Sequence, residues 1–109
     1  MIVLFLPAIA HGAPKDWWNE GWRYRLILRV PPRQSRAGIN TARIDLAEQS
    51  KLCAPDGRDV RVIDQQGRTL PHKVEGEKEN LKVRFLVRPD SRTYHLYYGN
   101  PKASPARHQ

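Results

Sequence analysis

An alternation of apolar and charged residues near the end of the chain constrains the fold more than any other feature. Between residues 81 and 88, apolar side chains occupy every second position, and three of the four alternating positions are Lys82, Arg84 and Arg88. Successive side chains of a β-strand point to opposite faces, so this run predicts a strand with one buried face. A second run, over residues 93–98, is rich in aromatic residues and is followed by a Gly-Asn-Pro turn. We expect the two runs to pair as antiparallel strands and to supply much of the core, through Leu81, Val83, Phe85, Val87, Tyr94, Leu96 and Tyr98.

The rest of the chain predicts further short strands separated by turns. These strands are expected over residues 22–30, 42–46, 60–63 and 69–74. A helical turn is expected over residues 47–52 and a hairpin turn over residues 64–67. Pro71 cannot donate to a ladder, so it places its strand at a sheet edge or a bulge. Six or so short strands with regular turn signals predict an all-β fold, namely an antiparallel, jelly-roll-like β-sandwich in a single small domain.

Length and charge set bounds on the partners of the chain. With 109 residues it forms one domain with a single modest core. Its 19 Lys and Arg residues against 11 Asp and Glu residues give a formal charge of +8, which attracts polyanions at low ionic strength. Cys53 is the one cysteine, so the chain has neither an intrachain disulfide nor a zinc site built from thiolates. We assign Cys53 no functional role.

The first thirteen residues resemble a secretory signal peptide. An apolar run too short to span a bilayer is followed by the small residues Ala8 and Ala10, which suit cleavage after Ala10, Gly12 or Ala13. An apolar N-terminal strand is the alternative. We therefore expect a leader over residues 1–13, a domain over residues 14–103 and a disordered tail over residues 104–109. The protein is then secreted, periplasmic or in the cell envelope, with no membrane span in the mature chain.

No group of residues predicts catalysis or a bound metal. Three aspartates lie close together in sequence, but Asp56 and Asp64 sit where turns favour Asp, and the three lack the spacing of a calcium loop. The mature histidines stand neither at metal-ligand spacing nor beside a nucleophile motif, and no Gly-x-Ser-x-Gly turn occurs. The aspartates are Asp56, Asp59 and Asp64, and the histidines are His72, His95 and His108. The sequence predicts a protein that is not an enzyme and that needs no cofactor.

Two groups of residues are candidates for ligand binding. Trp17 and Trp18 could stack on sugar rings, although a tryptophan at the head of a strand more often covers the core. Basic residues occupy one face of two predicted strands: Arg23, Arg25 and Arg29 in the first, and Lys82, Arg84 and Arg88 in the second. If these strands are neighbours, they form one cationic face that fits an anionic polysaccharide. A plain solvated face is the alternative, and the secretory leader argues against nucleic acid.

Three stretches together resemble a known bacterial family. They are Trp18 to Arg25, Gly57 to Pro71, and Tyr94 to Pro101, which ends in Tyr-Tyr-Gly-Asn-Pro. In order and spacing they resemble a domain of unknown function found in the extracytoplasmic part of large surface proteins, including some TolQ/ExbB-type proton-channel proteins. There the domain often precedes a concanavalin-like lectin domain. The resemblance implies a secreted β-sandwich module without catalytic residues.

Three functions remain open at this point. The first is a non-enzymatic envelope module that binds glycan or another surface component as part of a larger assembly. The second is a structural spacer with no ligand. In the third, the chain is the N-terminal piece of an ExbB-type channel or a lectin-like protein.

Overall fold

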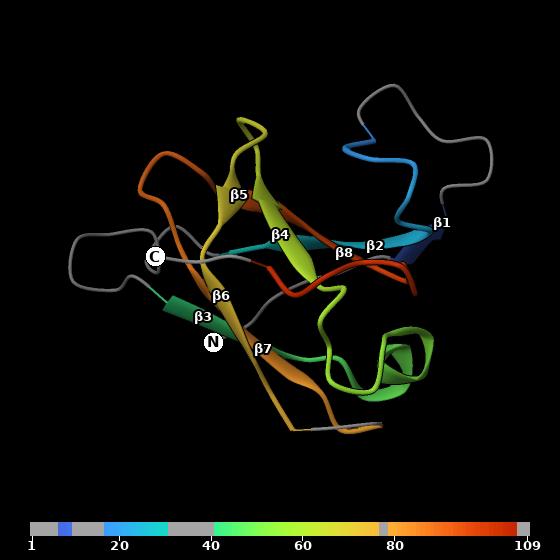
Figure 1. Ribbon diagram of the computed structural model, residues 1–109. Coiled ribbons are helices and arrows are strands. Elements are labelled where there is room, and N and C mark those ends of the chain that lie inside the picture. The colour runs from blue at the N-terminus through green and yellow to red at the C-terminus, as the bar shows by residue number, and fades with distance from the viewer. Residues whose placement is uncertain (1–6, 10–16, 31–40, 77–78, 107–109) are drawn as a thin grey trace.

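A computed structural model describes residues 7–9, 17–30, 41–76 and 79–106 of the protein. These residues form two antiparallel β-sheets (Figure 1). The larger sheet has the strand order β1-β2-β8-β4-β5, and the smaller one has the order β3-β7-β6. The strand bounds are β1 Pro7–Ile9, β2 Tyr24–Arg29, β3 Thr41–Asp45, β4 Arg61–Asp64, β5 Thr69–Leu70, β6 His72–Glu75, β7 Lys82–Leu86 and β8 Thr93–Tyr98. A short 3-10 helix, η2, spans Ala47–Leu52. The predicted all-β sandwich is confirmed.

The main core lies between the two sheets and contains every core residue that the sequence predicted. In the large sheet, Leu96 of β8 lies between Leu26 of β2 and Val62 of β4, and all three are fully buried. In the small sheet, Val83 of β7 lies opposite Ile44 of β3. The predicted core residues, all buried here, are Leu81, Val83, Phe85, Val87, Tyr94, Leu96 and Tyr98.

The predicted pairing of the last two strands is wrong. β7 pairs with β3 and β6, whereas β8 pairs with β2 and β4, so the two strands belong to different sheets. Each has one apolar face, and the two faces meet across the sandwich, where the Phe85 and Tyr94 rings lie 5.2 Å apart. The Tyr94 hydroxyl accepts a hydrogen bond from the Arg88 backbone N–H and donates to the Ser91 carbonyl, which holds the crossing between the sheets.

Pro71 divides the single strand expected over residues 69–74. β5 pairs with β4 in the large sheet, while β6 pairs with β7 in the small sheet, and Pro71 lies between them. Proline lacks the N–H that a continuous ladder needs, but its carbonyl accepts a hydrogen bond from Leu86. The hairpin turn predicted between β4 and β5 is present, with Gly67 at a φ of 84°. The chain therefore changes sheets at Pro71.

A second apolar cluster covers part of the outer face of the large sheet. Trp17 and Trp22 pack there against Ile63 and Tyr97, with Trp18 at the margin. The Trp22 backbone N–H bonds to Asn19, so Trp22 belongs to a turn, and β2 begins two residues later than the sequence predicted. The Trp17 indole N–H donates to the Trp22 carbonyl. The tryptophans thus fold back over the sheet as a cover, as the packing alternative proposed.

Parts of both predicted terminal segments belong to the described fold. Residues 7–9 of the predicted leader form β1 against β2, and the rest of the leader lies outside the described residues. In the predicted tail, the Ser104 carbonyl accepts a hydrogen bond from Arg61, and residues 107–109 lie outside the described part. No helix in the described ranges is long and apolar enough to cross a membrane.

Candidate functional site

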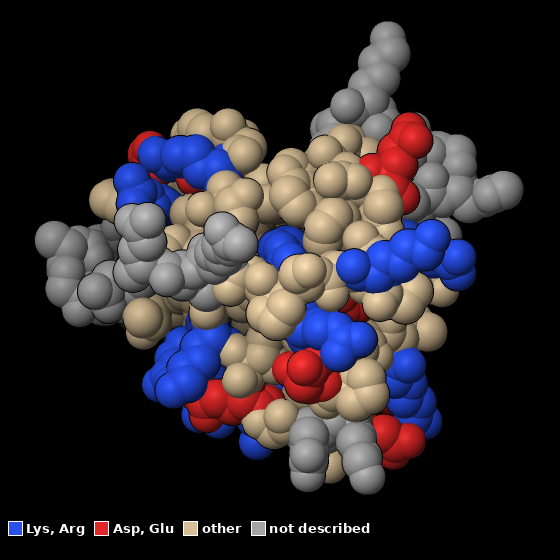
Figure 2. Space-filling model, viewed as in Figure 1, with Lys and Arg blue, Asp and Glu red and all other residues tan. Residues whose placement is uncertain are grey.

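The structure separates the two groups of basic residues that would have shared one face if their strands were neighbours. Arg25 and Arg29 lie on β2 of the large sheet, and Arg23 directly precedes it. Lys82 and Arg84 lie on β7 of the small sheet, and Arg88 follows that strand. The expectation of a single cationic face fails because β2 and β7 are in different sheets. On the face drawn in Figure 2, Lys and Arg side chains form separate groups among Asp and Glu.

Arg25 stabilises the tryptophan cover from beneath. It is only 6% exposed, and its guanidinium carbon lies 4.8 Å from the centre of the Trp17 ring. Its Nη1 donates to the hydroxyl of the buried Tyr97 at 3.4 Å. The same hydroxyl accepts the Trp18 backbone N–H at 3.0 Å. Arg25 and Trp17 are therefore parts of the packing on this face, whereas Trp18 lies at the edge of the packed cluster.

Beside this cover, a hollow of about 250 Å³ opens on the outer face of the large sheet. We call it the Trp18 groove. Trp18 forms its aromatic wall and is partly exposed. The centre of its ring lies 4.8 Å from that of Trp22 and 5.5 Å from that of Tyr97, so the two rings hold it in place. The groove is lined by Trp18, Ile63, Asp64, Gln65, Gly67, Thr93, His95 and Tyr97.

The strand register explains why polar groups reach this groove. On the outer face, His95 of β8 lies between Ile27 of β2 and Ile63 of β4. One row further, Thr93 lies opposite Arg29, and both side chains are at least partly exposed. The Gln65 side-chain oxygen accepts the backbone N–H groups of Arg92 and Thr93, which fixes its amide at the rim. An aromatic wall thus meets an imidazole, a hydroxyl and an amide.

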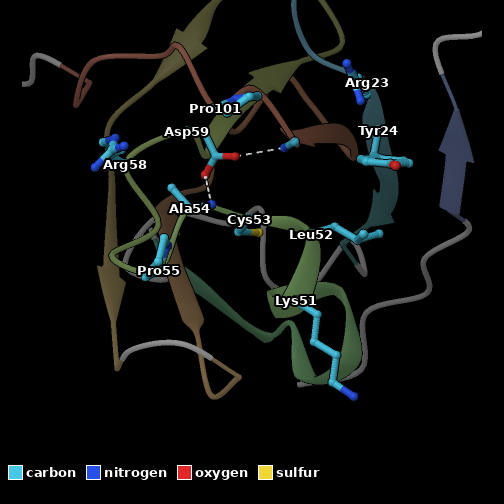
Figure 3. Close-up of a pocket in the computed structure, with 11 residues that line it drawn as sticks. Arg23, Tyr24, Lys51, Leu52, Cys53, Ala54, Pro55, Arg58, Asp59 and Pro101 are labelled. Carbon is cyan, nitrogen blue, oxygen red and sulfur yellow. Dashed lines mark hydrogen bonds between the residues drawn. The ribbon is translucent and has the colours of Figure 1, made fainter.

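A larger hollow of about 390 Å³ lies at one end of the sandwich, beside η2 (Figure 3). We call it the end pocket. Its inner residues include Tyr24, Leu52 and Cys53, and Leu52 is 47% exposed. Three basic residues stand at its rim, Arg23, Lys51 and Arg58, but Figure 3 shows the Lys51 ammonium group pointing away from the hollow.

The polar groups inside the end pocket are engaged in holding the fold. Asp59 is 1% exposed, and its carboxylate accepts backbone N–H groups from Ala54, Gly99 and Asn100 at 3.0, 2.9 and 3.1 Å. Burial, together with the charge of Asp59, raises the pKa of the Cys53 thiol to about 12, so the sulfur is a neutral thiol at neutral pH. These groups are therefore poorly suited to nucleophilic or acid–base chemistry.

Of the three aspartates that suggested a calcium loop, Asp56 and Asp64 serve turns, and Asp59 joins distant segments of the fold as described above. Asp64 accepts the backbone N–H groups of Gln66 and Arg68 and forms an ion pair with the Arg68 side chain. Asp56 accepts the backbone N–H of Arg58. Within the described ranges, no three His, Cys, Asp or Glu side chains gather in a way that could hold a metal ion.

Comparisons of the chain with protein-family models, with curated proteins and with solved structures found no match. The resemblance to the extracytoplasmic bacterial domain therefore stays a prediction.

Sequence reasoning found Trp18 but not most of the residues beside it. His95 and Thr93 alternate along β8 with the core residues Tyr94 and Leu96, and such an alternation is the signal that could have indicated an outer face. Gln65 showed only as part of a hairpin turn. Its approach to Thr93 joins residues 28 positions apart, which local sequence patterns do not reveal.

Proposed function

We propose that this protein is a secreted or envelope module without catalytic activity that binds glycan in the Trp18 groove, as part of a larger protein or assembly. The observation that carries the proposal is the partly exposed Trp18 ring beside the His95, Thr93 and Gln65 side chains. A pyranose has an apolar face, which stacks on an aromatic ring, and hydroxyl groups, which need hydrogen-bond partners at its edge. The groove offers both.

The support for this groove is stronger than the support for the larger end pocket. In the end pocket, the carboxylate of Asp59 is already bonded to three backbone N–H groups, and Lys51 points away. In the groove, His95 and Thr93 lie beside the aromatic wall on β8, which is paired on both sides, and regular elements are a favourable platform for binding. The export signal expected at residues 1–13 and the family resemblance support an extracytoplasmic location. N-terminal sequencing of envelope protein tests that location, and an intact Met1 on cytosolic protein would contradict it.

Titration of the full chain with neutral hexasaccharides tests the binding site. The probes are β-1,4-linked hexamers of glucose, xylose and N-acetylglucosamine, and calorimetry measures the affinity of the chain for each. Trp18→Ala should weaken binding of the preferred hexamer at least about tenfold, because truncating an aromatic anchor commonly costs about 2 kcal/mol or more. Trp18→Phe, which keeps a ring, should retain more of the affinity. Leu52→Ala, in the end pocket, is the control and should change the affinity less than about twofold.

Unfolding midpoints of the three variants show whether each one is folded at the titration temperature. Equal affinity of Trp18→Ala and the parent would remove the groove from the proposal. If no hexamer binds the parent, the module acts as a structural spacer instead.

A further inference from the structure

The outer face of the small sheet carries three cationic side chains in one row, one from each strand. Arg84 of β7 lies between Arg43 of β3 and Lys73 of β6 in the strand register. All three residues are exposed. We call them the cationic row. In Figure 2, Lys and Arg side chains lie beside Asp and Glu over the strands of the small sheet, at the lower left.

This arrangement works against the stability of the sheet. Like charges directly opposite each other on neighbouring strands repel and destabilise the pair. Arg84 forms an ion pair with Glu75 at 2.6 Å, but within the described part of the chain Arg43 and Lys73 form none. One acid against three cations leaves the row positive. The unbalanced positive charge of the row attracts anions from outside the fold.

We propose that the cationic row binds a linear polysaccharide with a carboxylate on each sugar, lying across the three strands. Neighbouring strands are about 4.8 Å apart, so the three cations recur at about that interval. The long, flexible Arg and Lys side chains can reach carboxylates that leave one polymer chain on different sides. Each contact is an exposed ion pair and is weak alone. Three contacts on one polymer strengthen one another, because the first brings the others into reach.

The next row of the same face argues against a membrane surface. It contains Asp45, Lys82 and Glu75, with an acid on each side of the lysine. A flat layer of anionic headgroups would meet both acids together with the cations. A single polymer chain that follows the cationic row avoids Asp45 and competes only with Glu75. Single-stranded nucleic acid is a poorer fit as well, because the described outer-face residues of this sheet include no aromatic side chain for base stacking.

This inference concerns a different face from the Trp18 groove and does not depend on the proposed function. Its test is titration of the full chain with hexagalacturonate at low salt. Exchanging both Arg43 and Arg84 for Gln should weaken binding about tenfold, the sum of two lost exposed ion pairs. The matched control exchanges Arg23 and Lys102 for Gln, which changes the net charge equally beside the large sheet. It should change the affinity less than about twofold.

Glu75→Gln gives an effect of opposite sign. It removes the acid that competes for Arg84, so hexagalacturonate should bind about two to five times more tightly. Neutral hexasaccharides should bind all of these variants like the parent, so failure here is distinct from failure at the groove. Equal losses in the two double variants, weaker binding by Glu75→Gln, or no binding by the parent would overturn the proposal. So would tighter binding to vesicles of anionic lipid or to a single-stranded oligonucleotide than to hexagalacturonate.

Discussion

Replacing Asp59 by Ala should destabilise the fold far more than replacing any exposed aspartate. The Asp59 carboxylate joins the segment after η2 to the end of β8, since it accepts N–H groups from Ala54, Gly99 and Asn100. Its own carbonyl accepts the Trp22 indole N–H, which brings the tryptophan cover to the same point. Ala54 and Gly99 are buried, and Asn100 is partly buried.

The magnitude follows from the donors that lose their acceptor. A buried N–H left without a partner costs about 1–3 kcal/mol, so Asp59→Ala should lower the free energy of unfolding by about 3 kcal/mol or more. Asp59→Asn keeps one acceptor oxygen. If that oxygen stays on Gly99 and Asn100, the bond to Ala54 is lost, and the expected cost is about 1–3 kcal/mol. The predicted order of stability is parent, then Asn, then Ala.

Urea unfolding followed by tryptophan fluorescence measures these differences. Asp56→Ala is the matched control, because Asp56 is exposed and, among the described residues, accepts one backbone N–H, from Arg58 at 3.2 Å. Its ion pair with Arg58 is long, at 3.8 Å, so the control should cost less than about 1 kcal/mol. If Asp59→Ala costs no more than Asp56→Ala, the carboxylate does not hold these segments together as described.

Three further predictions concern the stability of the core. Phe85→Ala should lower the free energy of unfolding by about 3–5 kcal/mol, because the ring is buried against Tyr94, and a loss below about 1 kcal/mol in urea would contradict this packing. Gly99→Ala should cost about 2–4 kcal/mol, because Gly99 has a φ of 83° and an added Cβ would clash with the Tyr24 ring; an unchanged urea midpoint would refute it. Burial raises the pKa of Cys53 from 9.0 and that of Tyr98 from 10.0, each to about 12. As the pH rises, the unfolded chain therefore loses these protons before the folded chain does, so the free energy of unfolding should fall between about pH 9 and 12. Cys53→Ala should make that fall less steep. Equal slopes of the free energy of unfolding against pH for parent and variant would exclude a contribution from the thiol.

The sequence predicted which residues face the core but not how the strands are combined. Alternation placed Leu81, Val83 and Phe85 on one buried face, because burial of apolar side chains follows the period of the strand. Pairing depends on contacts between distant residues, such as those that put β8 between β2 and β4. Local patterns carry little information about these contacts, so nearness in sequence led to the wrong pairing of β7 with β8.

For the candidate sites too, the sequence indicated single residues but not which residues lie together. The sequence singled out Trp18 as an aromatic residue that could stack on sugars, and the structure places it in the lining of the groove. Arg25 was expected at a surface and is buried beneath Trp17. An arginine at an alternating position is usually exposed, and only the tryptophan cover changes its environment. The cationic row contains Arg84, which the sequence analysis named as a candidate for ligand binding. The strand register places Arg43 and Lys73 beside it.

The most direct test of the central claim is to map the binding site by NMR with the full chain. Backbone amide shifts are followed while the preferred neutral hexasaccharide is added. The proposed function predicts that the largest shifts fall at Trp18, at residues 63–67 and at residues 93–97, which surround the groove. Shifts gathered instead at Tyr24, Leu52 and Cys53 would place the ligand in the end pocket and contradict the claim.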